Sequence, residues 1–307
     1  MCSGTCVLGK TTSCRGNKGS NFDMIVLLRF ALGGGNFAIS AGISMGAFAW
    51  QGQVVVITGA SGGIGAACAR ALDARGAQLV LNARSESGLA ALNLPDALLL
   101  HGDITLAATR EQLVARTLDR FGRVDVLVNN AGVGVYWPPS AARDEDTRRM
   151  FEVNFFAPLA LAQAVVPAMR RQRSGVIVNI SSIAGKVTLP WLTLYSASKF
   201  ALSSATAGLR MELARDGIHV MAVYPGYVKT QFQDHAIGAY PPPEIAKGKR
   251  FAISAQQCAR DILRGVERRS RSVVTPGWWR GFAGLHLLFP SLVEARLIRM
   301  NAGGGHR

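Results

Sequence analysis

Tyr195 and Lys199 are the first side chains in this sequence whose types and spacing could do chemistry. They stand four residues apart in the run Tyr195-Ser196-Ala197-Ser198-Lys199, and on a helix this spacing places both side chains on one face. A neighbouring ammonium group favours the phenolate and lowers a tyrosine pKa, which is ordinarily about 10. The pair is therefore a candidate proton donor and acceptor. A surface helix with a solvated lysine has the same spacing, so the elements around the pair must decide.

The chain from Gln53 onward predicts an α/β domain, because short β-branched runs alternate there with longer stretches of helical period. Seven strands are predicted, at Val54–Thr58, Gln78–Asn82, Leu98–His101, Val124–Asn129, Val176–Ser181, His219–Tyr224 and Ser272–Thr275. Helices are predicted at about Gly63–Arg75, Ala107–Phe121, Asp144–Arg173, Thr193–Arg215 and Ala255–Arg269. Pro158 and Pro167 predict a kink or break in the third helix. This alternation indicates a doubly wound parallel sheet between two layers of helices.

A glycine-rich turn follows the first predicted strand and opens the first predicted helix. It reads Thr58-Gly59-Ala60-Ser61-Gly62-Gly63-Ile64-Gly65. Glycine lets the backbone turn tightly and approach a pyrophosphate, which the free N–H groups at a helix N-terminus can bind. The spacing is GxxxGxG and not the usual GxGxxG, yet its place between strand and helix favours nucleotide binding over a simple tight connection.

The end of the second strand indicates which dinucleotide would bind. An acidic residue there would bind the ribose hydroxyl of NAD, whereas an arginine can take the 2′-phosphate of NADP. This sequence has Asn82-Ala83-Arg84-Ser85, which predicts NADP(H) over NAD(H) unless Arg84 is a solvated loop residue. Asp103, after the third strand, could accept from an adenine amino group or could cap the next helix.

Three further elements are expected at the carboxyl ends of the strands, where an open α/β sheet binds its ligands. The fourth strand runs into Asn129-Asn130-Ala131-Gly132, and the fifth ends at Ser182, thirteen residues before Tyr195. After the sixth strand come Pro225, Gly226 and Thr230.

Taken together, the TGxxxGIG, NNAG and YxxxK motifs, with the upstream serine and the Pro-Gly turn, make the chain resemble the classical short-chain dehydrogenase/reductase family from about Gln53 to Pro276. The resemblance implies a Rossmann-type sheet of seven strands and a homo-oligomer. It implies that Tyr195 is the catalytic acid/base, that Lys199 lowers its pKa and binds the nicotinamide ribose, that Ser182 binds the substrate oxygen, and that Asn154 holds a proton-relay water. It assigns cofactor contacts to Gly59, Ser61, Gly63, Ile64, Gly65, Asn130, Tyr195, Lys199, Pro225, Gly226 and Thr230.

Composition is that of a globular protein, with 307 residues, 49% of them hydrophobic and 17% charged. Most of the net charge of +15 falls after Ala246, where twelve Lys and Arg face three acidic residues. With no aromatic-interleaved basic motif, this charge does not predict nucleic-acid binding; it suits an anionic surface or a solvated face. Five unevenly placed cysteines predict a reducing, cytoplasmic compartment and no metal.

The two ends of the chain differ from the domain expected at residues 51–276. Residues 1–50 begin with a polar stretch and continue with an apolar stretch that is diluted by glycines. The first interpretation is that the true start of the protein is Met24 or Met45. The second is that these residues form a membrane or targeting segment. Residues 277–307 are basic and carry an apolar stripe. This stripe suits a peripheral membrane contact, or a pair of helices that pack on the domain, cover the pocket or form a dimer seam.

The predicted function is NADP(H)-dependent interconversion of a ketone or aldehyde and an alcohol on a small to medium apolar substrate. Alternatives are a nucleotide-sensing protein without turnover and a membrane-surface lipid, steroid or 3-oxoacyl reductase. An apolar substrate is expected because many apolar and aromatic residues follow the predicted site motifs, with Trp137 and Trp191 the best candidates to line the pocket. The full set is Val133, Tyr136, Trp137, Val187, Leu189, Trp191, Phe232, Ile237 and Tyr240.

Overall fold

A parallel sheet of seven strands forms the centre of the domain. The computed structural model describes residues 48–234, 236–238 and 251–302. The sheet order is β11-β7-β6-β4-β1-β2-β3, and every pairing in it is parallel. The bounds are β1 Val54–Thr58, β2 Gln78–Ala83, β3 Leu98–His101, β4 Val126–Asn129, β6 Gly175–Ile180, β7 Ile218–Pro225 and β11 Ser272–Thr275. The predicted Rossmann-type, doubly wound sheet is confirmed.

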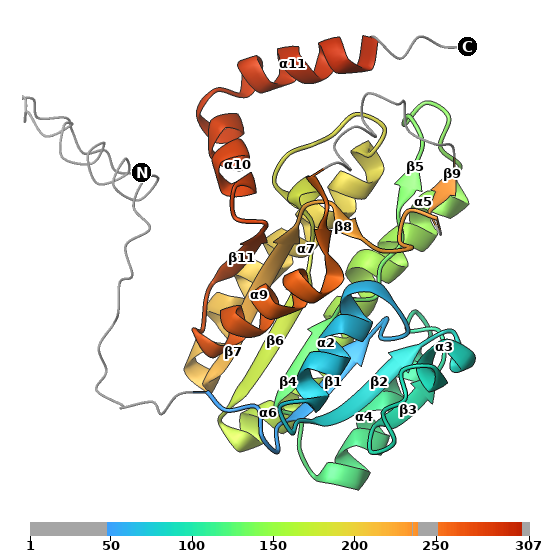
Figure 1. Ribbon diagram of the computed structural model, residues 1–307, viewed down its shortest axis with the longest axis vertical. Coiled ribbons are helices and arrows are strands. Elements are labelled where there is room, and N and C mark those ends of the chain that lie inside the picture. Colours follow the sequence, from blue (N-terminus) through green and yellow to red (C-terminus); the bar gives the residue numbers. More distant parts are fainter. Residues whose placement is uncertain (1–47, 235, 239–250, 303–307) are drawn as a thin grey trace, which may run out of the picture. The chain divides into compact units, whose positions relative to one another are not determined.

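Helices cover both faces of this sheet (Figure 1). On one face α2 (Gly63–Asp73) and α9 (Ala255–Glu267) pack over side chains such as Ile57 and Val128. On the other face α4 (Ala107–Phe121), α6 (Ala157–Gln172) and the end of α7 (Thr193–Glu212) pack over the alternate side chains, such as Val56 and Leu127. Because successive side chains of a strand point to opposite faces, the β-branched runs supply two separate cores.

The predicted helix Asp144–Arg173 is one helical path with a change of hydrogen bonding inside it. It comprises α5 (Asp144–Phe151), a π-helical turn at Glu152–Phe156 and α6. The Ala157 N–H donates to the Glu152 carbonyl, five residues back. Pro158 has no N–H with which to bond the Asn154 carbonyl four residues back, so the chain adopts the wider turn there. Pro167 lies inside α6, and the helix continues past it.

Several short elements were not predicted. They are α3 (Glu86–Ala90), the single-turn helices Ile183–Gly185 and Ala214–Asp216, and two small sheets that pair β5 (Val135–Tyr136) with β9 (Ile237–Gly238) and β8 (Val228–Lys229) with β10 (Ile253–Ser254). The predicted helix Thr193–Arg215 ends at Glu212. The unpredicted elements are two to five residues long, which is too short to show a hydrophobic period in the sequence.

The C-terminal region forms two helices, α10 (Trp279–Leu288) and α11 (Pro290–Ala302). Trp279 is buried and packs with Ile183, Tyr224 and Val274, so α10 joins the domain as one alternative anticipated. The interpretations of residues 1–47 as a start, anchor or targeting segment lie outside the described residues, and so does the segment that contains Tyr240.

Two segments of the described chain have the length and apolar character of a membrane-crossing helix. One is Asp144–Gln172, but half of its most apolar 18-residue stretch is buried inside the domain, as in a core helix. The other is the α10–α11 pair, which is bent by 112° at Phe289.

A buried polar network ties the carboxyl ends of β4 and β6 to α7. The Asn129 amide donates to Asn179 Oδ1 at 2.8 Å and to the Pro158 carbonyl at 3.2 Å, and the Asn179 amide donates to Thr206 Oγ1 at 2.9 Å. All three polar side chains are at most 2% exposed. Each buried donor thus has a partner on a different element, and this fixes how α7 lies on the sheet.

Replacing Asn179 with alanine should therefore destabilise the fold. It leaves the Asn129 amide and the Thr206 hydroxyl each short of one partner in the core, at a cost of roughly 2–4 kcal/mol in the free energy of unfolding. Urea denaturation measures this loss. The exposed Ser204 on the same helix provides the control, because Ser204→Ala should change stability by less than about 0.5 kcal/mol. Equal losses in the two variants would contradict the role given to the network.

Candidate active site

Tyr195 and Lys199 lie on the first two turns of α7, and both are buried. Tyr195 is 8% exposed and Lys199 is 3% exposed. The Lys199 ammonium lies 5.8 Å from the centroid of the Tyr195 ring and donates to the Ile180 carbonyl at 3.0 Å. The helical spacing therefore places the two groups side by side, and the carbonyl at the end of β6 holds the ammonium.

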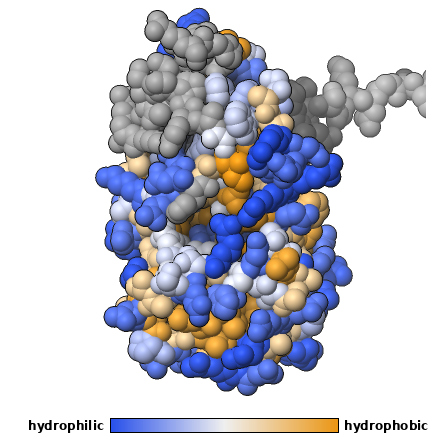
Figure 2. Space-filling model, turned by 90° about the vertical axis from the view of Figure 1, so that its right-hand side faces the viewer, coloured by the Kyte–Doolittle hydropathy of each residue, from blue (hydrophilic) through white to orange (hydrophobic). Residues whose placement is uncertain are grey.

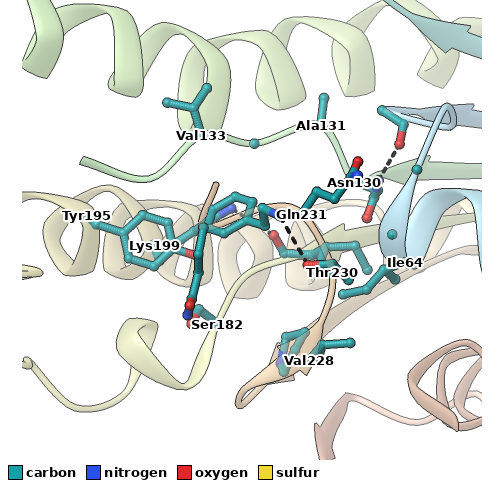
Figure 3. Close-up of a pocket in the computed structure, with 18 of the residues that line it drawn as sticks. Ile64, Asn130, Ala131, Val133, Ser182, Tyr195, Lys199, Val228, Thr230 and Gln231 are labelled. Atoms are coloured by element: carbon teal, nitrogen blue, oxygen red, sulfur yellow. Dashed lines mark hydrogen bonds between the residues drawn. The ribbon is translucent and has the colours of Figure 1, made fainter. Parts of the chain in front are cut away.

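Ser182 reaches the same place from the end of β6. It caps the turn Ile183–Gly185, where its Oγ accepts from the Ala184 N–H at 3.1 Å. A hydrogen bond also joins the side chains of Ser182 and Tyr195. Figure 3 shows Ser182, Tyr195 and Lys199 gathered at one end of the pocket.

Burial dominates the protonation of this cluster. It raises the pKa of Tyr195 to about 12, although the hydrogen bond with Ser182 acts in the opposite direction. Burial likewise lowers the pKa of Lys199 to about 8, because removal from water penalises the charged form. The lowered Tyr195 pKa expected from its lysine neighbour is not found in this structure, and the phenol keeps its proton at neutral pH.

Asn154 lies behind this pair, in the π-helical turn, and is completely buried. Its side chain exchanges two hydrogen bonds of 2.9 Å with the backbone of Val133 and donates to Ser198 Oγ at 3.1 Å. A methyl group added to Gly132 would lie 3.2 Å from Asn154 Oδ1 and 3.5 Å from Lys199 Nζ. Asn154 therefore anchors the segment after β4 against α7.

The glycine-rich turn is joined to the end of β4 at the opposite end of the pocket. The Asn130 amide donates to the carbonyls of Thr58 and Gly59 at 3.0 Å, and the Asn130 and Ala131 N–H groups donate to Thr58 Oγ1 at 3.1 Å. A Cβ at Gly65 would collide with the Gly59 carbonyl oxygen. Gly65 thus lets α2 start directly against the turn.

On its open side, the glycine-rich turn leaves room for a phosphate group beside the start of α2. Gly63 has φ +54°, and a Cβ there would lie 3.1 Å from Thr230 Cγ2. Gly62 precedes α2 without a side-chain cap and has open space beside it. Free N–H groups at a helix start beside open space fit the pyrophosphate of a dinucleotide.

The Pro225–Gly226 turn supplies a third wall. The Gly226 N–H donates to the Thr275 carbonyl at 2.8 Å, at the end of the neighbouring strand β11. A Cβ on Gly226 would collide with the Trp279 indole. The C-terminal helix α10 therefore packs directly on this turn, which the sequence did not indicate.

One cavity of about 560 Å³ joins these groups. Figure 2 shows a face of the molecule that is hollowed near its middle, with apolar and polar surface around the hollow. Predicted site residues that line the cavity are Gly59, Ser61, Gly63, Ile64, Arg84, Asn130, Ser182, Tyr195, Lys199, Pro225, Gly226 and Thr230. Three others, Gly65, Asp103 and Asn154, are not among its lining residues; Gly65 and Asn154 support residues that are.

Asp103 is not among the residues that line the cavity, and its side chain closes a short turn before α4. Its Oδ1 accepts from the Thr105 N–H at 3.0 Å and from the Thr105 hydroxyl at 2.8 Å. Partial burial raises its pKa, but these bonds and the charges of Arg84 and Arg149 together hold the pKa below the ordinary value. The predicted cap on the next helix is not seen, because α4 begins after Leu106 without a side-chain cap, and contact with adenine stays a prediction.

The substrate end of the cavity is apolar, but its composition differs from the expectation. Of the expected residues, Val133, Tyr136, Leu189 and Phe232 line it, whereas Trp137 and Trp191 do not. Trp137 packs against Gly238 instead. Lining residues that sequence reasoning missed include Leu192, Tyr227, Val228 and Gln231; only their nearness to the YxxxK and Pro-Gly motifs could have indicated them.

Comparisons with known proteins agree with this geometry. Residues 53–238 match the family described as short chain dehydrogenase. The chain is 35% identical over 233 residues to mouse "Dehydrogenase/reductase SDR family member 7B", covering 72% of each chain. It is 33% identical over 271 residues to Arabidopsis thaliana "11-beta-hydroxysteroid dehydrogenase 1A", covering 82% of this chain and 77% of the relative.

Solved structures show the same fold with nicotinamide cofactors bound. A Burkholderia phymatum short chain dehydrogenase/reductase in complex with NAD has a TM-score of 0.73 at 26% identity, covering 80% of this chain and 96% of that one. A Burkholderia cenocepacia short chain dehydrogenase in complex with NADP has a TM-score of 0.70 at 28% identity, covering 81% and 99%. The protein belongs to the short-chain dehydrogenase/reductase family and is an oxidoreductase that acts on CH–OH or carbonyl groups with a nicotinamide dinucleotide.

The buried Lys199 predicts a pH dependence of stability. Since its folded-state pKa of about 8 lies below the ordinary value of 10.5, only the unfolded chain holds this proton between those values, and stability rises with pH there. The free energy of unfolding of the wild type, relative to Lys199→Met, should increase by up to about 3 kcal/mol across this window. Urea denaturation at several pH values measures the difference. A difference that stays flat or decreases would contradict a desolvated ammonium.

Proposed function

We propose that the protein is an NADP(H)-dependent oxidoreductase that interconverts a ketone or aldehyde and an alcohol on a small to medium apolar substrate. The observation that carries this proposal is one cavity with a Ser182, Tyr195 and Lys199 cluster at one end and a glycine-lined helix start at the other. A bound nicotinamide would supply the hydride. The protein's task is then to bind the substrate oxygen and manage one proton.

Each residue of the cluster has a distinct task in carbonyl reduction. Tyr195 donates its proton to the substrate oxygen as negative charge develops there, and Ser182 donates a hydrogen bond to the same oxygen. The high pKa of Tyr195 suits this direction, since the phenol is protonated at neutral pH. Lys199 holds the cofactor ribose and stabilises the phenolate that remains. Asn154 holds the segment after β4 against α7. We also propose that Asn154 holds a water molecule that relays the proton.

Tyr195→Phe tests the acid directly. Loss of a positioned general acid should lower kcat about 10²- to 10⁴-fold, while the fold and the dissociation constant of NADPH stay near the wild-type values. NADPH oxidation over a panel of ketones, with fluorescence titration of NADPH, measures both. Tyr224→Phe is the control, because Tyr224 is buried outside the cavity. Near-normal turnover of Tyr195→Phe would exclude the assignment.

The preference for NADP(H) rests on the surroundings of Arg84. Arg84 is exposed and lines the cavity with Ser61 and Ser85. The Asn82 amide at the end of β2 donates to the carbonyls of Leu100 and Gly102, so it is engaged with β3. A guanidinium beside two hydroxyls suits a 2′-phosphate, and no carboxylate lines this part of the cavity among the described residues.

Arg84→Ala should therefore weaken NADP⁺ binding selectively. Loss of a charge-assisted hydrogen bond to phosphate costs about 1.5–3 kcal/mol, or roughly 10- to 100-fold in the dissociation constant. The dissociation constant of NAD⁺ should hardly change. Calorimetric titration of both cofactors measures this, with Arg116→Ala on the exposed surface of α4 as the control. Equal weakening of both cofactors would contradict a phosphate contact.

The apolar lining supports an apolar substrate, and a relative named as a hydroxysteroid dehydrogenase keeps the steroid or lipid alternative in view. A nucleotide-sensing protein without turnover is the other alternative. The meeting of Ser182, Tyr195 and Lys199 in one cavity favours catalysis, because a sensor would not need a proton donor. We also propose a cytoplasmic homo-oligomer, in which exposed apolar side chains such as Phe156 and Phe200 could form the contact between subunits.

Contact with a membrane surface is proposed for the α10–α11 helices. Large apolar side chains are exposed there, and Arg280, Arg296 and Arg299 lie on the same two helices. Apolar insertion combined with basic charge suits an anionic bilayer surface. The exposed apolar residues are Leu285, Leu287, Leu288, Phe289, Leu292 and Ile298.

Sedimentation with anionic phospholipid vesicles tests this contact. The protein should pellet with the vesicles at low salt and less at high salt, because salt screens the attraction between basic side chains and anionic headgroups. Leu287→Glu combined with Leu292→Glu should abolish pelleting. Met211→Glu, at an equally exposed apolar residue on α7, should not. No binding at low salt would remove the membrane contact.

A further inference from the structure

Tyr136 adds a further hydroxyl to the cavity wall. It lines the cavity, is 8% exposed, and packs in one apolar cluster with Met150, Leu192 and Tyr195. Its aromatic ring is thus part of the floor beside the proposed acid. The reaction proposed above uses the hydroxyls of Ser182 and Tyr195, and it leaves that of Tyr136 without a task.

Within the described part of the chain, the Tyr136 hydroxyl is accessible and has no hydrogen-bond partner. It makes no hydrogen bond with any other residue that the structure describes. Among the residues that the structure describes, the side-chain N or O atoms that are fully enclosed and have no hydrogen-bond partner belong to Trp137, Trp279 and His286. The Tyr136 hydroxyl is not one of these fully enclosed atoms. The Tyr136 oxygen therefore keeps some accessible surface, and because its residue lines the cavity we place that surface in the cavity.

The backbone around Tyr136 is fixed. Strand β5 pairs with β9, so that Val135 faces Ile237 and Tyr136 faces Gly238, and the Ile237 N–H donates to the Gly134 carbonyl at 2.9 Å. Gly238 has φ +105°, and a Cβ there would lie 2.7 Å from the Tyr136 carbonyl oxygen. Glycine is thus required for this close pairing, which holds the tyrosine in the wall.

The Tyr136 hydroxyl is a hydrogen-bond donor that lies close enough to Tyr195 and Tyr227 for their charge to act on it. Burial raises its pKa, and negative charge on Tyr195 or Tyr227 would raise it further, so it remains protonated across the physiological range. A protonated phenol in an apolar wall is costly to leave without an acceptor once a ligand has displaced water from it.

We propose that Tyr136 binds a second oxygen of the substrate, distinct from the carbonyl or alcohol oxygen held by Ser182 and Tyr195. This inference rests on the proposed function and narrows its substrate class. Substrates are then apolar molecules with two oxygen functions, a reacting carbonyl and an acceptor such as a second ketone, an ester or an ether. A site that pairs a buried donor with such an acceptor discriminates against analogues that lack it.

Matched pairs of ketones test this proposal with the intact protein and NADPH. Each pair has the same size and differs by the second oxygen function: methyl pentyl ketone and ethyl acetoacetate, methyl hexyl ketone and ethyl levulinate, para-ethylacetophenone and para-methoxyacetophenone. In at least one pair the wild type should prefer the member with the second oxygen by about 10-fold in kcat/KM. Tyr136→Phe should lose this preference through KM and keep kcat for the simpler ketone.

Tyr224→Phe is the matched control and should keep the preference. The thermal midpoint of Tyr136→Phe should not fall, since the hydroxyl has no hydrogen-bond partner to lose among the described residues. No preference in any wild-type pair, or a preference that survives in Tyr136→Phe, would overturn the proposal.

Binding separates this inference from the proposed function. The same pairs are titrated by protein fluorescence into wild type and Tyr136→Phe, each saturated with NADP⁺. If no ketone is turned over but the pair preference appears in binding and depends on Tyr136, the proposed reaction fails and the second-oxygen site stands. If ketones are turned over without any pair preference, the reaction stands and the site fails.

Discussion

Hydrogen bonding of buried amides at the ends of β4 and β6 is the constraint on which the site depends. A parallel sheet delivers its polar strand ends to one edge, but the ends must be held in register with α7, which carries Tyr195 and Lys199. Asn129, Asn179 and Thr206 do this from inside the core. Because an unpaired amide is costly there, the network permits one arrangement of the three elements.

The same principle extends to both ends of the cavity. At one end, Asn154 pairs with the Val133 backbone and with Ser198, and a π-helical turn forced by Pro158 presents it. At the other end, Asn130 and Thr58 join the end of β4 to the glycine-rich turn. Side chains that bond to the protein's own backbone thus determine where the groups at the two ends of the cavity lie.

Burial sets the chemical character of those groups. An ammonium near a phenol suggests a lowered phenol pKa, but both groups are almost fully removed from water, and desolvation acts on each more strongly than the neighbour does. The consequence is a protonated tyrosine beside a lysine held by a carbonyl. This state is suited to delivering a proton to a carbonyl substrate.

The sequence by itself determined the fold class, the seven strands of the sheet and most of the motif residues that line the cavity, because hydrophobic period and short motifs are local properties. It also indicated the family, which the comparisons confirm. Tertiary structure decided what depends on distant contacts: Trp137 packs against Gly238 and not into the cavity, Trp279 covers Gly226, and burial raises the pKa of Tyr195. Packing partners and desolvation arise only when segments far apart in the chain meet, so no local pattern could encode them.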